Sequence, residues 1–177
     1  WSNTGTGSGG QAWYDMSIAC DPNNENTIYV GGVNIWKSTN GGSTWSIVGH
    51  WYGAGSTPYV HADHHDAIFR PNTSELYVGT DGGVYKTTNG GKSWKKILYQ
   101  NPKTGAADLV MDPTNPNKLI AAMWEHKRDP WFFNSGGEGS GLFVSYDGGE
   151  SWKEKTEEDG LPKGKLGRIG LAIAKNK

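Results

Sequence analysis

The segment Thr87-Thr88-Asn89-Gly90-Gly91-Lys92-Ser93-Trp94 decides the fold, because its pattern occurs three times in the chain. The pattern is hydroxyl, any residue, Asn or Asp, Gly, Gly, any residue, hydroxyl, Trp. Asn-Gly and Asp-Gly supply the positive φ angles that a tight hairpin turn needs. The Trp then begins the returning strand and buries its ring against the sheet. The pattern predicts three hairpins whose structural residues are Ser38, Asn40, Gly42, Trp45, Thr87, Asn89, Gly91, Trp94, Ser145, Asp147, Gly149 and Trp152.

Strand-like runs accompany each hairpin and form a four-stranded unit that recurs along the chain. The units span about 14–49, 64–99 and 106–156, and 168–174 resembles the first strand of a further unit. Their length is close to the roughly 40–50 residues of a propeller blade, and propellers close with about four to eight blades. We therefore expect an all-β fold: a single partial β-propeller over 1–177, with three four-stranded antiparallel blades plus the first strand of a fourth. The chain is then a fragment of a longer one.

Composition agrees with this class and excludes several functions. The 177 residues include 27 Gly and 9 Trp, which suits short strands joined by tight turns. The net charge of −1 gives no reason to expect nucleic acid as a partner. No apolar run approaches the ~20 residues that cross a bilayer, so membrane insertion is not expected. Residues 1–11 are predicted as loop, and the absence of an initiator Met suggests an excised or mature fragment. The single Cys20 is expected to be a buried, inert thiol.

The repeated pattern resembles the Asp-box, or bacterial neuraminidase repeat, of sialidases, xyloglucanases and the sortilin ectodomain. The run 77–94 is most similar to secreted sortilin-like and xyloglucanase-like propeller proteins of environmental bacteria. The resemblance implies a propeller and an extracellular or cell-surface location. It does not imply one activity, because the same repeat serves hydrolases, receptors and assembly factors. Arg168 alone does not make the arginine cluster expected of a sialidase.

Strand alternation separates two faces of the propeller. With strands A to D in each blade, the A–B and C–D turns share one face, while the B–C turns lie on the other. The repeated hairpins are C–D turns, so we expect recognition on the opposite face. Two unusual segments, 50–65 and 123–140, fall there in neighbouring blades and are expected to line one groove.

The first segment ends in a cluster of His and Asp that has three interpretations: a metal site, a polar loop bonded to the next blade, or a ligand-contacting site. A divalent ion needs three or four converging ligands, and same-side residues of a strand lie about 7 Å apart. We predict no metal and no other cofactor. The candidate ligand-binding residues here are His61, His64 and His65.

Three carboxylates are candidates for glycoside hydrolysis, which uses a pair of acids across a cleft. Asp63 belongs to the His-rich cluster, while Asp66 and Asp108 each lie five residues before a Pro in adjacent units. Equal positions in adjacent units are also what a structural, repeat-encoded Asp would produce. Both interpretations remain open from the sequence.

The second segment, 123–140, is predicted to be a long loop rich in aromatic residues. It packs onto its own blade as a plug, the favoured interpretation, or it offers a platform on which sugar rings stack. The candidate ligand-binding residues are Trp124, His126, Trp131 and Phe132, together with Arg168 from the last predicted strand. Two functions follow: a secreted module that binds polysaccharide or protein alongside the remaining blades, or, as the alternative, a xyloglucanase-like glycoside hydrolase.

Overall fold

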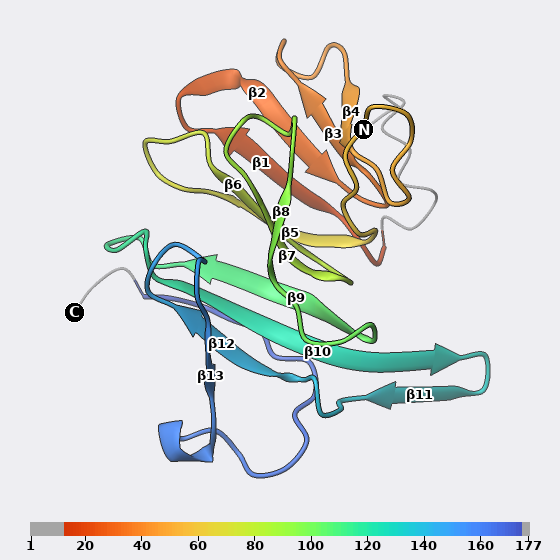
Figure 1. The fold of residues 1–177 in the computed structure, drawn as a ribbon, viewed down its shortest axis with the longest axis vertical. Coiled ribbons are helices and arrows are strands. Elements are labelled where there is room, and N and C mark those ends of the chain that lie inside the picture. Colours follow the sequence, from red (N-terminus) through yellow and green to blue (C-terminus); the bar gives the residue numbers. More distant parts are fainter. Residues whose placement is uncertain (1–12, 175–177) are drawn as a thin grey trace.

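The computed structural model of the protein describes residues 13–174, so the loop predicted for 1–11 lies outside the described residues. Within this range the fold consists of three antiparallel β-sheets, stacked one after another in chain order (Figure 1). The prediction of an all-β fold built from consecutive four-stranded antiparallel sheets is confirmed. A short 3₁₀ turn, Glu157–Asp159, follows the last strand.

Each sheet pairs its strands mainly in sequence order. The first sheet contains β1 (Ser17–Asp21), β2 (Asn24–Gly31), β3 (Ile35–Ser38) and β4 (Ser46–Gly49). The second contains β5 (His64–Phe69), β6 (Leu76–Thr80), β7 (Gly83–Thr87) and β8 (Lys95–Leu98). The third contains β9 (Thr104–Met111), β10 (Leu119–Asp129), β11 (Phe132–Ser135), β12 (Gly141–Ser145) and β13 (Lys153–Lys155).

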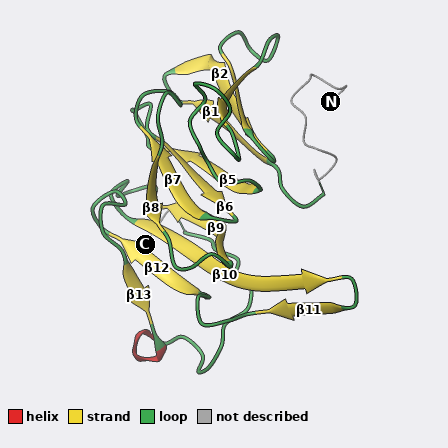
Figure 2. Ribbon diagram, turned by 45° about the vertical axis from the view of Figure 1, so that its right-hand side comes forward, coloured by secondary structure: helices red, strands yellow, loops and turns green. Residues whose placement is uncertain are grey.

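The third sheet departs from the prediction of a long loop at 123–140. Here β10 runs on past the strands that flank it and pairs with the extra strand β11, from His126↔Ser135 to Asp129↔Phe132. The resulting β10–β11 hairpin projects well beyond the rest of its sheet (Figure 2). The loop prediction was wrong because the polar residues of β10 satisfy their backbone groups by pairing with β11, which needs no buried face.

Residues 168–174, predicted as a first strand of a fourth blade, form no strand in the described part of the chain. Their side chains nevertheless alternate in exposure as those of a strand do. The backbone N–H of Leu171 donates to the carboxylate of Asp108 in β9 at 2.8 Å, so the segment runs beside β9. The segment is extended but is not counted as a strand, because no neighbouring strand among residues 13–174 forms a ladder of backbone hydrogen bonds with it.

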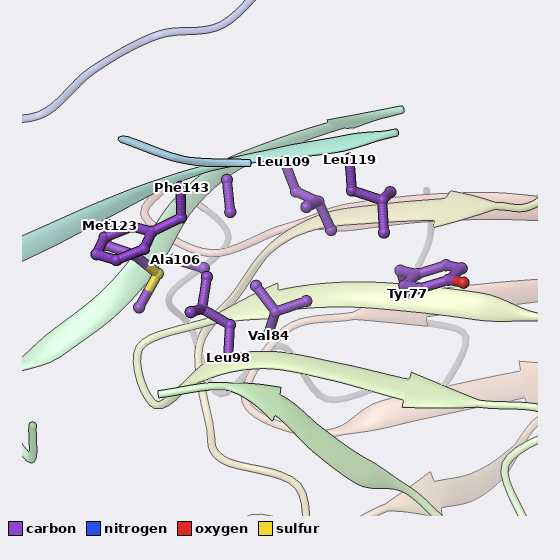
Figure 3. Packing of buried hydrophobic residues seen from close by; sticks show 9 residues of the cluster. Tyr77, Val84, Leu98, Ala106, Leu109, Leu119, Met123 and Phe143 are labelled. Atoms are coloured by element: carbon purple, nitrogen blue, oxygen red, sulfur yellow. The ribbon is translucent and has the colours of Figure 1, made fainter. Parts of the chain in front are cut away.

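The second and third sheets pack through a continuous apolar core. Side chains from β6, β7 and β8 meet those of β9, β10 and β12, with Tyr77, Leu109, Leu119 and Met123 almost fully buried (Figure 3). A second cluster joins the first and second sheets through Tyr29, Ile35, Val60, Leu76, Val78 and Tyr85. Each sheet thus depends on its neighbour to bury its apolar side chains. Burial of each large apolar side chain stabilises the fold by about 1.5–3 kcal/mol.

The three repeated turns have the same hydrogen bonds. The first hydroxyl accepts the N–H of the second Gly: Gly42 to Ser38 (2.9 Å), Gly91 to Thr87 (3.0 Å) and Gly149 to Ser145 (2.8 Å). The Asn or Asp side chain accepts the N–H of the second hydroxyl residue: Thr44 to Asn40, Ser93 to Asn89 and Ser151 to Asp147. In the first two turns the Asn amide also donates to that hydroxyl, whereas in the third the Ser151 hydroxyl donates to the Asp147 carboxylate.

The second and third turns also contact the sheet before them. Trp94 Nε1 donates to the carbonyl of Val48 in the first sheet at 2.9 Å, and Tyr77 Oη donates to the carbonyl of Gly148 at 3.0 Å. Trp45 and Trp152 instead donate to Gly carbonyls within their own turns. The repeated turns therefore stabilise single hairpins and, in two of three cases, the contact between sheets.

The expectation of a buried Cys20 was wrong, because this residue is exposed. Along β1 the side chains of Ser17 and Ala19 point toward the molecule, while those of Ile18 and Cys20 point away. No sheet among residues 13–174 covers that outer side of β1.

Candidate functional site

A cluster of polar side chains lies where the strands end, on the side of the sheets opposite the repeated turns. We call these two sides the edges of the sheets. Tyr14 and Asp15 precede β1, Asp63 precedes β5, and Asp81 lies in the turn between β6 and β7. The repeated turns connect β3 to β4, β7 to β8 and β12 to β13, so they occupy the other edge. His126 comes from the part of β10 that extends past its neighbours. Three sheets therefore contribute to one cluster.

Hydrogen bonds join three of these side chains, together with His65 of β5, in a row. His65 Nε2 donates to Asp81 Oδ1 at 2.7 Å, and the hydroxyl of Tyr14 donates to Asp81 Oδ2 at 3.0 Å. His126 Nε2 lies 3.3 Å from the same hydroxyl oxygen, whose only proton goes to Asp81, so His126 is the donor there. Although burial favours its neutral form, the hydrogen bonds from His65 and Tyr14 hold the pKa of Asp81 below its ordinary value. The carboxylate of Asp81 stays ionised.

Two further carboxyl groups, those of Asp15 and Asp63, lie beside this row. Asp15 has no exposed surface, and neither of its carboxyl oxygens has a hydrogen-bond donor among the described residues. Burial and then the charge of Asp63 raise the pKa of Asp15 to about 6. Burial and then the charge of Asp81 raise the pKa of Asp63. Asp63 also has a φ of 62°, a left-handed conformation that costs a non-Gly residue about 1–2 kcal/mol.

Two of the predicted His ligands do not join the row of hydrogen bonds. His64 is fully buried, and its Nδ1 donates to the carbonyl of Gly32 in the first sheet. Burial lowers the pKa of His64 to about 4, so the ring is neutral near pH 7. His61 contacts the carbonyl of Ala62 and packs closely on Gly82. Of the three His residues, only His65 contacts the cluster through Asp81.

Asp66 and Asp108, candidates for a catalytic pair, connect neighbouring sheets. Asp66 accepts the backbone N–H of Leu109 at 3.1 Å and that of Ala67 at 2.8 Å. Asp108 makes the equivalent bond to the N–H of Leu171. Burial followed by the nearby charge of Asp108 raises the pKa of Asp66. The repeated geometry favours the structural interpretation of both residues over the catalytic one.

The base of the β10–β11 hairpin is a stack of rings. Trp124 is only 5% exposed and lies parallel to His126, with ring centroids 4.1 Å apart. Phe133 meets Trp124 edge-on at 6.1 Å. The guanidinium of Arg168 lies 5.4 Å from the centre of the Trp124 ring, so this predicted residue does reach the stack.

The outer part of the hairpin is open to solvent. Trp131 is 86% exposed and Phe132 is 53% exposed, so the expectation that this segment packs onto its own blade was wrong for them. Trp13, beside Tyr14, is also largely exposed. The polar cluster reaches the hairpin at its base, where Tyr14 contacts His126. Phe132 pairs with Asp129 and so faces the other side of the hairpin, the side of Glu125.

The other face of the hairpin carries a hollow of about 370 Å³ lined by Lys103, Glu125 and Lys165 among others. Glu125 projects there, on the opposite side of β10 from Trp124 and His126. Its carboxylate already accepts from the N–H of Gly139 at 2.9 Å and the amide of Asn101 at 3.3 Å. The hollow is therefore separate from the polar cluster.

The residues that sequence patterns did not single out for this site are Tyr14, Asp81 and Arg128. Asp81 precedes Gly82 and Gly83, which marks it as a turn residue and hides its role in the cluster. Arg128 lies over the rings of Phe133 and Tyr14. No group of three or more His, Cys, Asp or Glu side chains among residues 13–174 is arranged to hold a metal ion.

Comparison with known proteins places this geometry in a family. Residues 33–160 match the family Sortilin-Vps10, described as sortilin, neurotensin receptor 3. The chain belongs to the Sortilin-Vps10 family. The resemblance to sortilin-like and xyloglucanase-like propeller proteins is thus confirmed, and the three sheets are propeller blades.

The curated relatives are xyloglucanases. The chain is 30% identical over 171 residues to one from a Paenibacillus species, and 31% identical over 110 residues to one from Hypocrea jecorina. The first match covers 89% of this chain and 16% of the relative, and the second covers 49% and 13%. The chain therefore spans less than a fifth of the length of these relatives.

Solved structures of the same kind share the fold. An ancestral GH74 enzyme superposes with a TM-score of 0.58 at 29% identity, over 77% of this chain and 17% of its own. The GH74 xyloglucanase from Xanthomonas campestris superposes with a TM-score of 0.55 at 18% identity, over 77% and 20%. In residues 13–174 there is no helix of the length and apolar character that a membrane crossing requires.

Proposed function

We propose that this chain is part of a secreted β-propeller that binds polysaccharide on the edge opposite its repeated turns. The observation that carries the proposal is the β10–β11 hairpin, which holds Trp131 and Phe132 out in solvent while Trp124 and His126 are packed at its base. An aromatic ring that stays exposed on a β-hairpin offers a flat apolar surface, and the C–H faces of sugars stack on such surfaces.

The similarity to xyloglucanases supports a polysaccharide as the ligand and an extracellular or cell-surface location. Recognition of a protein on the same surface is the nearest variant of this proposal. We propose further that residues 1–177 belong to one propeller, with blades at about 14–49, 64–99 and 106–156. Residues 168–174 supply the first strand of the next blade, and the remaining blades are partners of this chain.

Affinity electrophoresis of the full chain in gels containing xyloglucan, other neutral glucans or polygalacturonate tests the proposal. We expect retardation by at least one polysaccharide and a loss of about tenfold or more in affinity for Trp131→Ala. Tyr146→Ala is the matched control, because Tyr146 is also an exposed aromatic ring but lies in the third repeated turn, on the other edge. A folded chain that no polysaccharide retards contradicts the proposal.

Glycoside hydrolysis is the second candidate function. The observation favouring it is that two neighbouring carboxyl groups have pKa values shifted in opposite directions, upward in Asp63 and downward in Asp81. A carboxyl group whose pKa is raised beside a carboxylate whose pKa is lowered is the arrangement of a general acid and a base or nucleophile. Asp63 is the candidate acid and Asp81 the candidate base or nucleophile.

Release of reducing ends from xyloglucan tests this second candidate. Asp63→Asn and Asp81→Asn should each reduce the rate by at least a hundredfold, whereas Glu150→Gln, on the edge with the repeated turns, should leave it unchanged. Binding without any release of reducing ends leaves the binding function alone. Activity that survives both Asn variants excludes these two residues as the catalytic pair.

A further inference from the structure

Two arginine side chains converge on the ring stack at the base of the hairpin. The guanidinium of Arg168 lies 5.4 Å from the centre of the Trp124 ring, and that of Arg128 lies 5.2 Å from the centre of the Phe133 ring. The rings of Trp124 and Phe133 are themselves in edge contact at 6.1 Å. Arg128 comes from β10 and Arg168 from the segment that runs beside β9, so the fold brings two cations from separate segments to one stack of rings.

Neither arginine is neutralised by the residues that the structure describes. Both are exposed, and within 13–174 neither donates a hydrogen bond or forms an ion pair. The carboxylate of Asp129, close to Arg128 on the same hairpin, pairs with Lys127 at 3.0 Å. Asp81 is bonded to His65 and Tyr14. The two guanidinium groups therefore form a positive site without an acidic partner.

The neighbouring His126 responds to this positive site. Burial is the main reason that the pKa of His126 is lowered, and the charges of Arg128 and Arg168 both contribute in the same direction. The two cations thus act on the same imidazole from separate segments. An anion bound beside them would offset the repulsion that both exert on a protonated His126.

The stacked geometry also determines which anion fits. A guanidinium that lies over an aromatic ring keeps its N–H groups free at the edge of its plane, in a fork that matches the two oxygens of a carboxylate. Stacking restricts the side chain in advance, so less conformational freedom is lost when the ligand binds. The exposed rings of Phe133, on the same side of the hairpin as Arg128, and of Trp131 at its tip provide the apolar surface for the rest of a sugar.

We propose that Arg128 and Arg168 bind the carboxylate of a uronic acid residue in the polysaccharide. This inference rests on the proposed binding function and specifies its ligand as an acidic polysaccharide. The sugar ring that carries the carboxylate lies against the hairpin, and the neighbouring sugars of the chain extend toward Trp131. A neutral glucan would leave both cations without a partner.

Calorimetric titration with oligogalacturonate at 150 mM NaCl tests the proposal on the full chain. The matched ligand is the same oligosaccharide with its carboxylates methyl-esterified, which keeps the sugar rings and removes the charge. We expect esterification to weaken binding by on the order of ten- to a hundredfold, the size of a lost charge-assisted hydrogen-bond pair. Arg128→Gln and Arg168→Gln should each lose a similar factor toward oligogalacturonate and little toward the ester.

Lys92→Gln is the matched control variant, because it removes one exposed positive charge from a repeated turn on the opposite edge. It should retain the affinity for oligogalacturonate. An equal loss in Lys92→Gln would overturn the proposal, since binding would then depend on net charge and not on the two arginines. Thermal unfolding of each variant verifies that the fold is intact.

The remaining outcomes separate this inference from the function beneath it. Equal binding of the acid and its methyl ester, or binding of neutral xyloglucan alone, overturns the uronate site and leaves polysaccharide binding in place. Tighter binding of dextran sulfate than of oligogalacturonate overturns the assignment to a carboxylate. Failure to bind any polysaccharide in the same assay overturns both.

Discussion

The hydroxyl of Tyr14 donates to Asp81 Oδ2 at 3.0 Å, and this one bond joins the segment before the first sheet to a turn of the second. The same oxygen of Tyr14 lies 3.3 Å from His126 Nε2 in the third sheet. One phenol therefore connects all three blades on the edge where we propose that ligand binds. Its removal affects stability and the site together.

Tyr14→Phe should lower the free energy of unfolding by about 1.5–3 kcal/mol, because it removes a hydrogen bond to an ionised carboxylate. The pKa of Asp81 should rise at the same time, since one of the two side-chain donors that hold it low is gone. Urea denaturation at pH 7 measures the first effect. Tyr52→Phe is the control, because Tyr52 is mostly exposed and should change stability by less than about 0.5 kcal/mol. Equal effects in the two variants would contradict the structural role of the Tyr14 bond.

Asp66→Ala should destabilise the protein more than Asp66→Asn. The Ala variant leaves the backbone N–H groups of Leu109 and Ala67 without their acceptor, and each unsatisfied buried group costs about 1–3 kcal/mol. The Asn side chain keeps one acceptor oxygen and removes a carboxyl group whose pKa burial has raised. Chemical denaturation distinguishes the two variants. If Asn and Ala are equally destabilising, Asp66 does not act through these hydrogen bonds.

The pH dependence of stability between about pH 4 and 6 reflects two buried groups with opposite effects. The folded-state pKa of Asp15 is raised to about 6, so its contribution is complete at low pH and is lost as the pH rises through 6. The folded-state pKa of His64 is lowered to about 4, so the unfolded chain binds a proton first as the pH falls below 6.5, and stability falls with it. The two slopes oppose each other in the same window.

Asp15→Asn removes one of these slopes. Stability of the variant should rise with pH from 4.5 to 6 more steeply than that of the unmodified protein, by up to about 1.4 kcal/mol per pH unit for one proton. Denaturation series at several pH values measure the difference. Parallel curves for the two proteins would mean that Asp15 titrates as an ordinary exposed carboxyl group.

Two Gly→Ala substitutions separate backbone strain from contact between blades. Gly91 and Gly55 both have positive φ, 87° and 61°, which costs Ala about 1–2 kcal/mol. A Cβ at Gly91 would lie 2.8 Å from the Cβ of Val48 in the neighbouring sheet, whereas a Cβ at Gly55 has nothing within 4 Å. Gly91→Ala should therefore be the more destabilising by about 1–3 kcal/mol, the cost of overpacking. Similar unfolding midpoints for both would show that the turn does not dock on the first blade.

Sequence patterns predicted the framework because the framework depends on local rules. Asn-Gly-Gly at 40–42 and 89–91 and Asp-Gly-Gly at 147–149 each fix a turn by φ angles and side-chain bonds within a few residues. The alternating direction of successive antiparallel strands then predicted that the repeated turns share one edge. These features do not depend on how distant segments meet.

The candidate site was less predictable because it depends on contacts between blades. Asp81 is ordinary in its own turn and becomes distinctive only beside His65 and Tyr14. The β10–β11 hairpin escaped prediction because the charged residues near Arg128 lack the alternation of a half-buried strand. Cys20 was predicted as buried from its apolar neighbours, although a strand turns alternate residues to opposite sides and only one side of β1 is covered.

The difference between Asn and Asp in the repeated turns makes the chain unevenly sensitive to acid. Asn40 and Asn89 carry no titratable group, so protons leave the first two hairpins unchanged. Bonds from the Ser151 hydroxyl and backbone, and then from Ser145, hold the pKa of Asp147 far below its ordinary value, and they are given up once the pH falls low enough to protonate it. Strong acid should thus destabilise the third repeated hairpin, while the two preceding hairpins keep their side-chain hydrogen bonds.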